Sequence, residues 1–268
     1  MGVYYINPYA FVNPKRNILQ MLQALGYSSQ IKCALDAVDL ATWPGSGQTL
    51  TDLTGNNNNF IRGATTGSES SDPSINGTAG ELGASNYVAF DGGDYLLESA
   101  AHTFAETWHN NNALFTMIFV MRIASLANQF IFDNSDSQTG INLVASSTGA
   151  IGVNVWRGGD AIEGFQLTSA YSAGADVLIG LSINEASSAG LMYANGATAV
   201  SATASYFNPG TSDASTYAYR IGASAFGSGS NLLTSGSRLY AAAFLDGVAL
   251  DATAFDAIRA DFQARGIS

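Results

Sequence analysis

The sequence has few charged residues and little basic character. Only 12% of the 268 residues are charged, and 10 Lys and Arg stand against 21 Asp and Glu, for a formal net charge of -11. No cluster of Lys or Arg offers a surface for phosphates, and acidic chains are repelled by anionic lipid headgroups. The apolar runs are shorter than the roughly 20 residues that cross a bilayer. We therefore expect neither nucleic acid nor a membrane as a partner.

The sequence contains a single cysteine, Cys33, so an intrachain disulfide is excluded. We expect its side chain to be a small buried apolar group. The N-terminus lacks the basic start, apolar stretch and small-residue cleavage site of a secretory signal peptide. We expect synthesis in a cytoplasm, with release by another route, such as a virus particle freed by lysis, if the protein works outside a cell.

From Ile31 onward the sequence shows β-strand patterns separated by clusters of Gly, Asn, Ser and Asp. Strands are predicted at residues 31–37, 86–90, 95–99, 114–123, 129–133, 140–145, 150–157, 164–168, 176–184, 189–195, 217–223 and 238–245. No regular helices lie between them, as a parallel sheet would require. The pattern predicts an all-β fold in which antiparallel sheets stack as a sandwich or jelly roll.

Local patterns add detail to this prediction. Val177, Ile179, Leu181 and Ile183 alternate with other residues and should face the core. The pair Asn195-Gly196 suits a type I' turn before a further strand. A C-terminal helix is predicted over residues 253–264, with Asp251 as its cap and Gly266 as its stop.

Residues 1–28 differ from the jelly-roll region at 29–268. Asn13 at the N-cap, Pro14 at the first helical position and Gly26 beyond the end predict a short amphipathic helix after an aromatic, extended stretch. This segment either packs on its own domain or anchors the chain to another protein. The residues expected to mediate such anchoring are Tyr4, Tyr5, Tyr9, Phe11, Ile18 and Leu22.

The stretch Asp91-Gly92-Gly93-Asp94 places two carboxylates around a glycine pair. Glycine admits a positive φ and Asp favours turns, so the stretch predicts a hairpin between two strands. A metal or catalytic site is the alternative.

Four stretches resemble the laminin G-like and concanavalin A-like lectin/glucanase domains. YVAFDGGDYL (87–96) resembles their F-D-G-x-x-D-Y-L strand pair, and residues 34–63 resemble their opening strand and loop. FTMIFVMRI (115–123) and residues 238–265 resemble a middle strand and the closing strand with its helix. The resemblance covers about residues 30–268 and implies a concanavalin A-like jelly roll.

The glucanase members of this fold use two Glu on one strand, in a pattern like E-x-D-x-x-E. Every Glu of this sequence is isolated from a second one at that spacing. His102 and His109 lie seven residues apart, whereas a zinc-hydrolase pair stands four apart around a Glu. We expect no catalytic activity.

The resemblance also implies candidate binding sites. Related domains bind calcium through Asp and Asn oxygens, and Asp91, Asp94, Asp133, Asn134 and Asp136 could supply them, although turn chemistry explains the same residues. We otherwise expect no cofactor.

A lectin needs an aromatic platform beside polar groups. The first candidates are Trp156, Arg157 and Asp160, and the second are Trp43 and Tyr193. The alternative is that Trp156 only ends a strand and packs in the core.

The combination of an aromatic N-terminal segment with one jelly roll resembles virion proteins of tailed bacteriophages. It implies a non-enzymatic structural protein on the virion surface, as a head decoration, head fibre or tail component. Capsid, neck or tail proteins would be its partners, in many copies or as a homo-oligomer, and adhesion to host polysaccharide is a further expected role. The alternatives are a secreted bacterial carbohydrate-binding module and, less favoured, a glycoside-active enzyme of the same fold.

Overall fold

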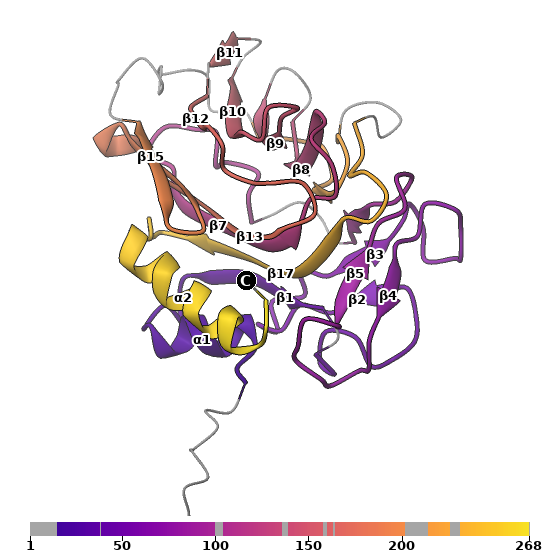
Figure 1. Cartoon of the computed structure of the whole chain (residues 1–268). Helices are drawn as coiled ribbons and strands as arrows, with labels where there is room; N and C mark the ends of the chain where they lie inside the picture. The colour runs from indigo at the N-terminus through magenta and orange to yellow at the C-terminus, as the bar shows by residue number, and fades with distance from the viewer. Residues whose placement is uncertain are drawn as a thin grey trace, which may run out of the picture.

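The computed structural model describes residues 15–37, 39–99, 104–135, 139–157, 160–162, 164–201, 214–225 and 231–267. They form two antiparallel sheets packed face to face, with two helices on the outer side of one sheet (Figure 1). The predicted all-β sandwich is confirmed. In the part of the chain that the structure describes, no helix is long and apolar enough to span a membrane.

The first sheet, sheet A, contains the longest strands. Its order is β15 (Ala197–Ser201), β14 (Ala189–Ala194), β13 (Asp176–Asn184), β7 (Leu114–Arg122), β17 (Arg238–Asp246), β5 (Tyr87–Ala89) and β4 (Ser74–Asn76), and β1 (Ile31–Asp36) also pairs with β17. β14 and β15 are joined at Asn195, whose φ is 47°, and Gly196, whose φ is 97°. Both residues have the positive φ of a type I' turn, as the sequence predicts.

Sheet B contains shorter strands. Its order is β11 (Asp160–Ile162), β10 (Ile151–Arg157), β9 (Gly140–Ala145), β8 (Gln129–Asp133), β16 (Arg220–Ile221), β6 (Leu96–Glu98), β3 (Phe60–Arg62) and β2 (Thr49–Leu50), and β12 (Gln166–Leu167) pairs with β10. Several of these strands have only two or three residues. Such strands carry too little alternation to be recognised in the sequence, which is why β2, β3, β4 and β11 were not predicted.

The main core lies between the two sheets. The four alternating residues of β13 predicted to face it, Val177, Ile179, Leu181 and Ile183, are all buried there. Phe244 of β17 lies among aromatic rings from both sheets, including Phe119 and Phe132 at 5.6 and 5.4 Å between centroids. Cys33 is also buried here, as predicted.

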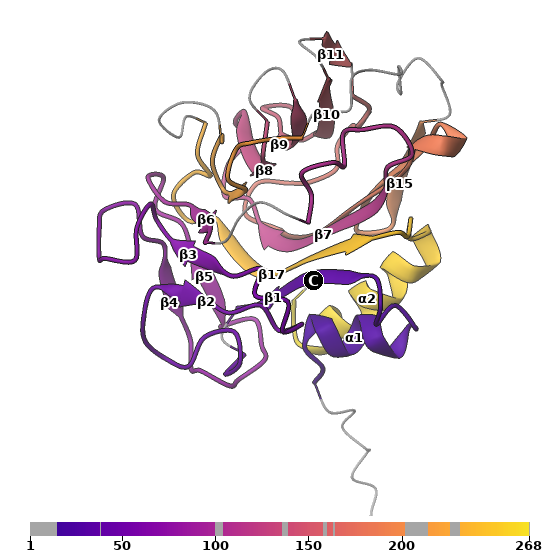
Figure 2. The same ribbon diagram turned by 180° about the vertical axis from the view of Figure 1, so that it is seen from behind.

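A second apolar layer lies between sheet A and the two helices, α1 (Ile18–Ala24) and α2 (Ala252–Ala264). Figure 2 shows both helices on the same side of β1 and β17. The opposite face of β13 is therefore buried too. Gly180 lies directly beneath Phe255 of α2, and a Cβ on that glycine would fall 2.4 Å from the ring. A short 3-10 helix, η1 (Glu185–Ser187), follows β13.

The start of α1 differs from the prediction. The N-cap is Asn17 rather than Asn13, because the Asn17 side chain accepts from the Gln20 N–H at 2.9 Å and the Gln20 side chain accepts from the Asn17 N–H at 3.1 Å. Asn13 and Pro14 lie outside the described residues. The sequence left two alternatives for this helix, packing on its own domain or anchoring to another protein. In the structure it packs on its own domain.

The predicted hairpin at Asp91 to Asp94 is wrong. β5 pairs with β4 and β17 in sheet A, whereas β6 pairs with β3 and β16 in sheet B. The turn therefore carries the chain from one sheet to the other. Its local chemistry is as expected, since Gly92 has a φ of 102° and both carboxylates accept backbone N–H groups within the turn.

Candidate functional site

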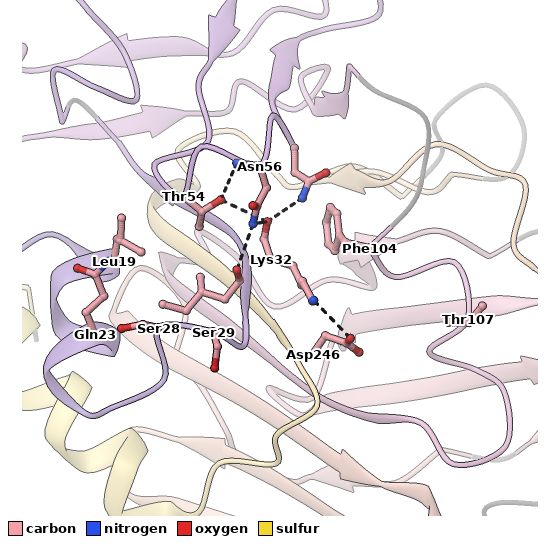
Figure 3. A pocket seen from close by; sticks show the side chains of 12 residues that line it. Leu19, Gln23, Ser28, Ser29, Lys32, Thr54, Asn56, Phe104, Thr107 and Asp246 are labelled. Carbon is pink, nitrogen blue, oxygen red and sulfur yellow. Dashed lines mark hydrogen bonds and ion pairs between the residues drawn. The ribbon is translucent and has the colours of Figure 1, made fainter.

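A cavity of about 530 Å³ opens beside the start of β1, where helix α1 and three chain segments meet (Figure 3). The side chains around it come from α1 and the turn after it, β1, the loop at 54–58, the segment at 104–107 and the last residue of β17. We call this cavity the Lys32 pocket. It is lined by Leu19, Gln23, Ser28, Ser29, Ile31, Lys32, Thr54, Asn56, Asn58, Phe104, Thr107 and Asp246.

The loop wall of the pocket is held by side-chain amides. Asn56 Nδ2 donates to the carbonyl oxygens of Ile31 and Lys32, at 3.2 and 3.0 Å. Asn58 Nδ2 donates to the same Lys32 carbonyl at 2.7 Å. These bonds join the loop to the edge of β1 and fix the positions of the Asn56 and Asn58 amides.

The same loop is organised from within by Asp52. This carboxylate is buried, with 3% of the residue exposed, and its Oδ1 accepts from the N–H groups of Ala34 and Thr54, both at 3.0 Å. Its Oδ2 accepts from the Thr54 hydroxyl at 2.6 Å and from the Asn58 N–H at 3.3 Å. A buried carboxylate with this many donors fixes the backbone that carries Thr54, Asn56 and Asn58.

The opposite side of the pocket carries its two charged groups. Lys32 Nζ lies 3.8 Å from Asp246 Oδ2, and the two side chains are 38% and 44% exposed. The other carboxylate oxygen, Oδ1, accepts from Trp108 Nε1 at 3.1 Å. Trp108 is buried and stacks on Phe115 with 4.5 Å between centroids, so it gives Asp246 a fixed partner.

The pocket therefore offers hydroxyl, amide, ammonium and carboxylate groups close together. Phe104 is its one aromatic wall residue, but it is only 8% exposed because its ring packs on Tyr219 and Phe244. A ligand would be recognised mainly through hydrogen bonds, with a small apolar contact. Among the described residues, no group of three His, Cys, Asp or Glu side chains is placed to hold a metal ion.

The aromatic residues predicted as a glycan platform do not come together. Trp156 is half-buried on β10 of sheet B, and its indole Nε1 is buried. Tyr193 lies on sheet A in the layer beneath α2, fully buried, where it stacks on Phe255 and donates to Asp256 Oδ1 at 2.6 Å. Tyr193 is therefore a core residue, and its prediction as a glycan contact is wrong.

Two further residues of that set pair across adjacent strands. Arg157 and Asp160 face each other at the β10–β11 turn, and their side chains lie outside the described part of the chain. Trp43 is half-buried in the loop after β1, and it does not line the Lys32 pocket.

The predicted anchoring residues divide into two groups. Tyr4, Tyr5, Tyr9 and Phe11 lie outside the described residues, so their role stays a prediction. Ile18 and Leu22 are fully buried between α1 and the rest of its own domain. Because both side chains are buried in the protein's own core, neither is available as an attachment surface.

The calcium candidates have structural roles. Asp133 is 1% exposed and accepts from the Ser135 and Ser224 hydroxyls and from the Ala225 N–H, which ties β8 to the segment after β16. Asn134 likewise bridges the Ala105 carbonyl and the Ile141 N–H. Asp136 lies outside the described residues.

At the turn between the sheets, Asp94 is buried and accepts from the Asp91 N–H at 2.7 Å. Burial raises the pKa of Asp94 to about 6. In the structure this carboxylate serves the turn itself, as the acceptor for the Asp91 N–H.

The Lys32 pocket was missed because its residues are scattered along the sequence. Lys32, Asn56, Thr107 and Asp246 belong to four separate segments and form no local motif. One signal was present. The Asn-rich run at 56–59 follows Asp52 in the loop that the resemblance to lectin domains already singled out.

No protein-family model matches the chain, and no curated protein matches it. Solved structures do. The binding domain of botulinum neurotoxin DC, solved with rat synaptotagmin II, superposes with a TM-score of 0.59 at 10% identity, over 89% of this chain and 52% of that chain. The binding domain of Paraclostridial Mosquitocidal Protein 1 gives 0.59 at 13% identity, over 88% and 52%.

A carbohydrate-binding module is similar as well. The CBM40 of the Ruminococcus gnavus IT-sialidase gives a TM-score of 0.50 at 12% identity, over 63% of this chain and 95% of that one. The chain spans about half the length of the toxin binding domains it matches. At these identities the likeness shows the fold alone, an antiparallel sandwich of two sheets.

Proposed function

We propose that this chain is a glycan-binding module without catalytic activity, and that the Lys32 pocket is its binding site. The observation that carries the proposal is the lining of the pocket, where hydroxyl, amide and charged side chains surround one cavity. Saccharides present hydroxyl groups that both donate and accept hydrogen bonds. Fixed amides and hydroxyls are their natural partners.

Two features support a binding role over hydrolysis. Glycoside hydrolysis uses a pair of carboxyl groups across the sugar bond, and Asp246 is the single carboxylate among the described residues that line the pocket. The fold is also that of modules that bind, including a sialidase CBM40 and a botulinum neurotoxin binding domain solved in complex with SialylT. A carbohydrate-binding module fits these two features better than a glycoside-active enzyme does.

The proposal is tested by screening the full chain on a glycan array and comparing two lysine variants. The chain has only two lysines, Lys15 and Lys32. Lys32→Ala removes a donor from the pocket and should weaken binding about fivefold, which corresponds to roughly 1 kcal/mol. Lys15→Ala makes the same chemical change outside the pocket and should leave binding unchanged. Equal effects of the two variants, or an array blank for every glycan, would contradict the proposal.

We further propose that this module is displayed on a phage particle. This second proposal rests on the aromatic residues Tyr4, Tyr5, Tyr9 and Phe11. The test is to delete residues 1–14 only, because α1 belongs to the folded domain. The shortened chain should fold with an unchanged melting temperature and fail to enter particles. Normal incorporation would rule out anchoring by this segment. Capsid or tail genes beside this gene would favour the proposal that the protein is part of a virion.

A further inference from the structure

The charged pair in the Lys32 pocket bears on which glycans can bind there. Asp246 stands at the end of β17, and its N–H donates to the Gln30 carbonyl at 2.9 Å. Trp108 holds one oxygen of its carboxylate, so the other oxygen, Oδ2, faces Lys32. Figure 3 shows the Lys32 ammonium directed at this carboxylate. The position of the negative charge is therefore set by the fold.

An ionised carboxylate can only accept hydrogen bonds. The hydroxyl groups of a neutral sugar can donate to Asp246 Oδ2 while they accept from Lys32 Nζ, and the 3.8 Å gap between these atoms leaves both partly exposed. One neutral ligand can therefore use both charged groups at once.

An anionic sugar meets a different balance of forces. Its carboxylate would be attracted by Lys32 and repelled by Asp246, and because these two opposite charges lie only 3.8 Å apart, the two effects largely offset each other. The formal charge of -11 on the whole chain adds a long-range repulsion. Among the described residues that line the pocket, Lys32 is the only cation, so none of them reverses that balance.

We infer that the Lys32 pocket selects neutral saccharides over anionic ones, with Asp246 as the residue that sets this preference. The inference rests on the proposed function, since it names the class of glycan for the same site. Asp246 is a specificity residue here because it accepts from ligand hydroxyls and repels ligand carboxylates.

The experiment uses pairs of glycans that differ only in charge. Suitable pairs are homogalacturonan with its methyl ester, and sialylated glycans with the methyl esters of their sialic acids, each titrated into the full chain at low salt. Wild type should bind the neutral member of each pair roughly fivefold more tightly or better. Asp246→Asn keeps an acceptor for Trp108 but removes the charge, so it should weaken neutral binding and strengthen anionic binding.

Asp91→Asn is the matched control. It removes the same charge at an exposed turn residue that does not line the pocket, so it should leave the preference unchanged. Tighter binding of the anionic members by wild type, or the same preference in Asp246→Asn as in wild type, would overturn the inference and leave the glycan-binding function standing. Binding to neither member of any pair, together with an array blank for every glycan, would overturn the proposed function itself.

Discussion

Arg265 and Asp36 form a two-pronged ion pair in the interior of the protein. Arg265 Nη1 and Nη2 each lie 2.7 Å from one Asp36 oxygen, and both side chains are 1% exposed. Asp36 also accepts from the N–H of Ile18, the first residue of α1, at 3.0 Å. The last residue of β1, the start of α1 and the end of α2 therefore meet at one carboxylate. The helical layer is joined to sheet A by this contact as well as by apolar packing.

Removing one partner of this pair should be costly. Arg265→Ala leaves the Asp36 charge buried without its counterion, and we expect a loss of about 3–5 kcal/mol in the free energy of unfolding. Urea denaturation measures it. Arg16→Ala is the control, because Arg16 and Asp261 pair at a partly exposed position and should contribute under about 1 kcal/mol. Similar losses in the two variants would contradict a structural role for the buried pair.

Gly180 should not tolerate a side chain. Its Cβ would enter the Phe255 ring, which is fully buried and cannot move aside, so Gly180→Ala should destabilise the protein by about 1–3 kcal/mol through overpacking. Thermal unfolding measures the change. Gly152→Ala, on a strand of sheet B where the nearest atom would be 3.4 Å away, should cost far less. A double variant with Phe255→Leu should recover part of the loss.

Asp94 should make stability depend on pH. Folding raises its pKa to about 6, so the folded state favours the protonated carboxyl group. This contribution is fully present below about pH 4, the usual value for Asp, and is lost as the pH rises through about 6. We expect Asp94→Asn to be more stable than wild type at pH 7.5, by about 1 kcal/mol after allowance for solvent near the turn. The difference should vanish at pH 4. Urea midpoints that differ equally at both values would contradict this origin.

Asp52 should control the shape of the pocket wall. Asp52→Ala removes the acceptor for four donors in the 52–58 loop and its neighbours, and should cost about 2–3 kcal/mol in the free energy of unfolding. Glycan affinity should fall with it, although Asp52 does not line the pocket. Asp52→Asn keeps one acceptor and should be intermediate in both measurements. Full affinity in Asp52→Ala would show that the loop needs no such support.

Much of the fold follows from local patterns in the sequence. The alternation at Val177 to Ile183, the Asn195-Gly196 turn and the Asp251 cap are each decided by neighbouring residues, and the structure confirms them. The Asp91 to Asp94 turn was misjudged because a hairpin and a crossover between sheets use the same turn residues. What separates them is the pairing of β5 and β6 with distant strands.

The candidate site was harder to predict than the fold. Tyr193 looks like an exposed aromatic residue in the sequence, but α2, some 60 residues later, covers it. The Lys32 pocket depends on contacts such as that between Lys32 and Asp246, which are 214 positions apart in the numbering and meet only because β1 pairs with β17. Long-range pairing of this kind has no signature in a single sequence.

The most direct measurement of the central claim is a map of where a bound glycan touches the protein. Two-dimensional NMR of the labelled chain, titrated with a saccharide that the array identifies, reports this through backbone amide shifts. Shifts should cluster at the loop 54–58, at Lys32 and Asp246, and at Thr107. Shifts that cluster instead around Trp156 or Trp43, with the Lys32 pocket silent, would contradict it.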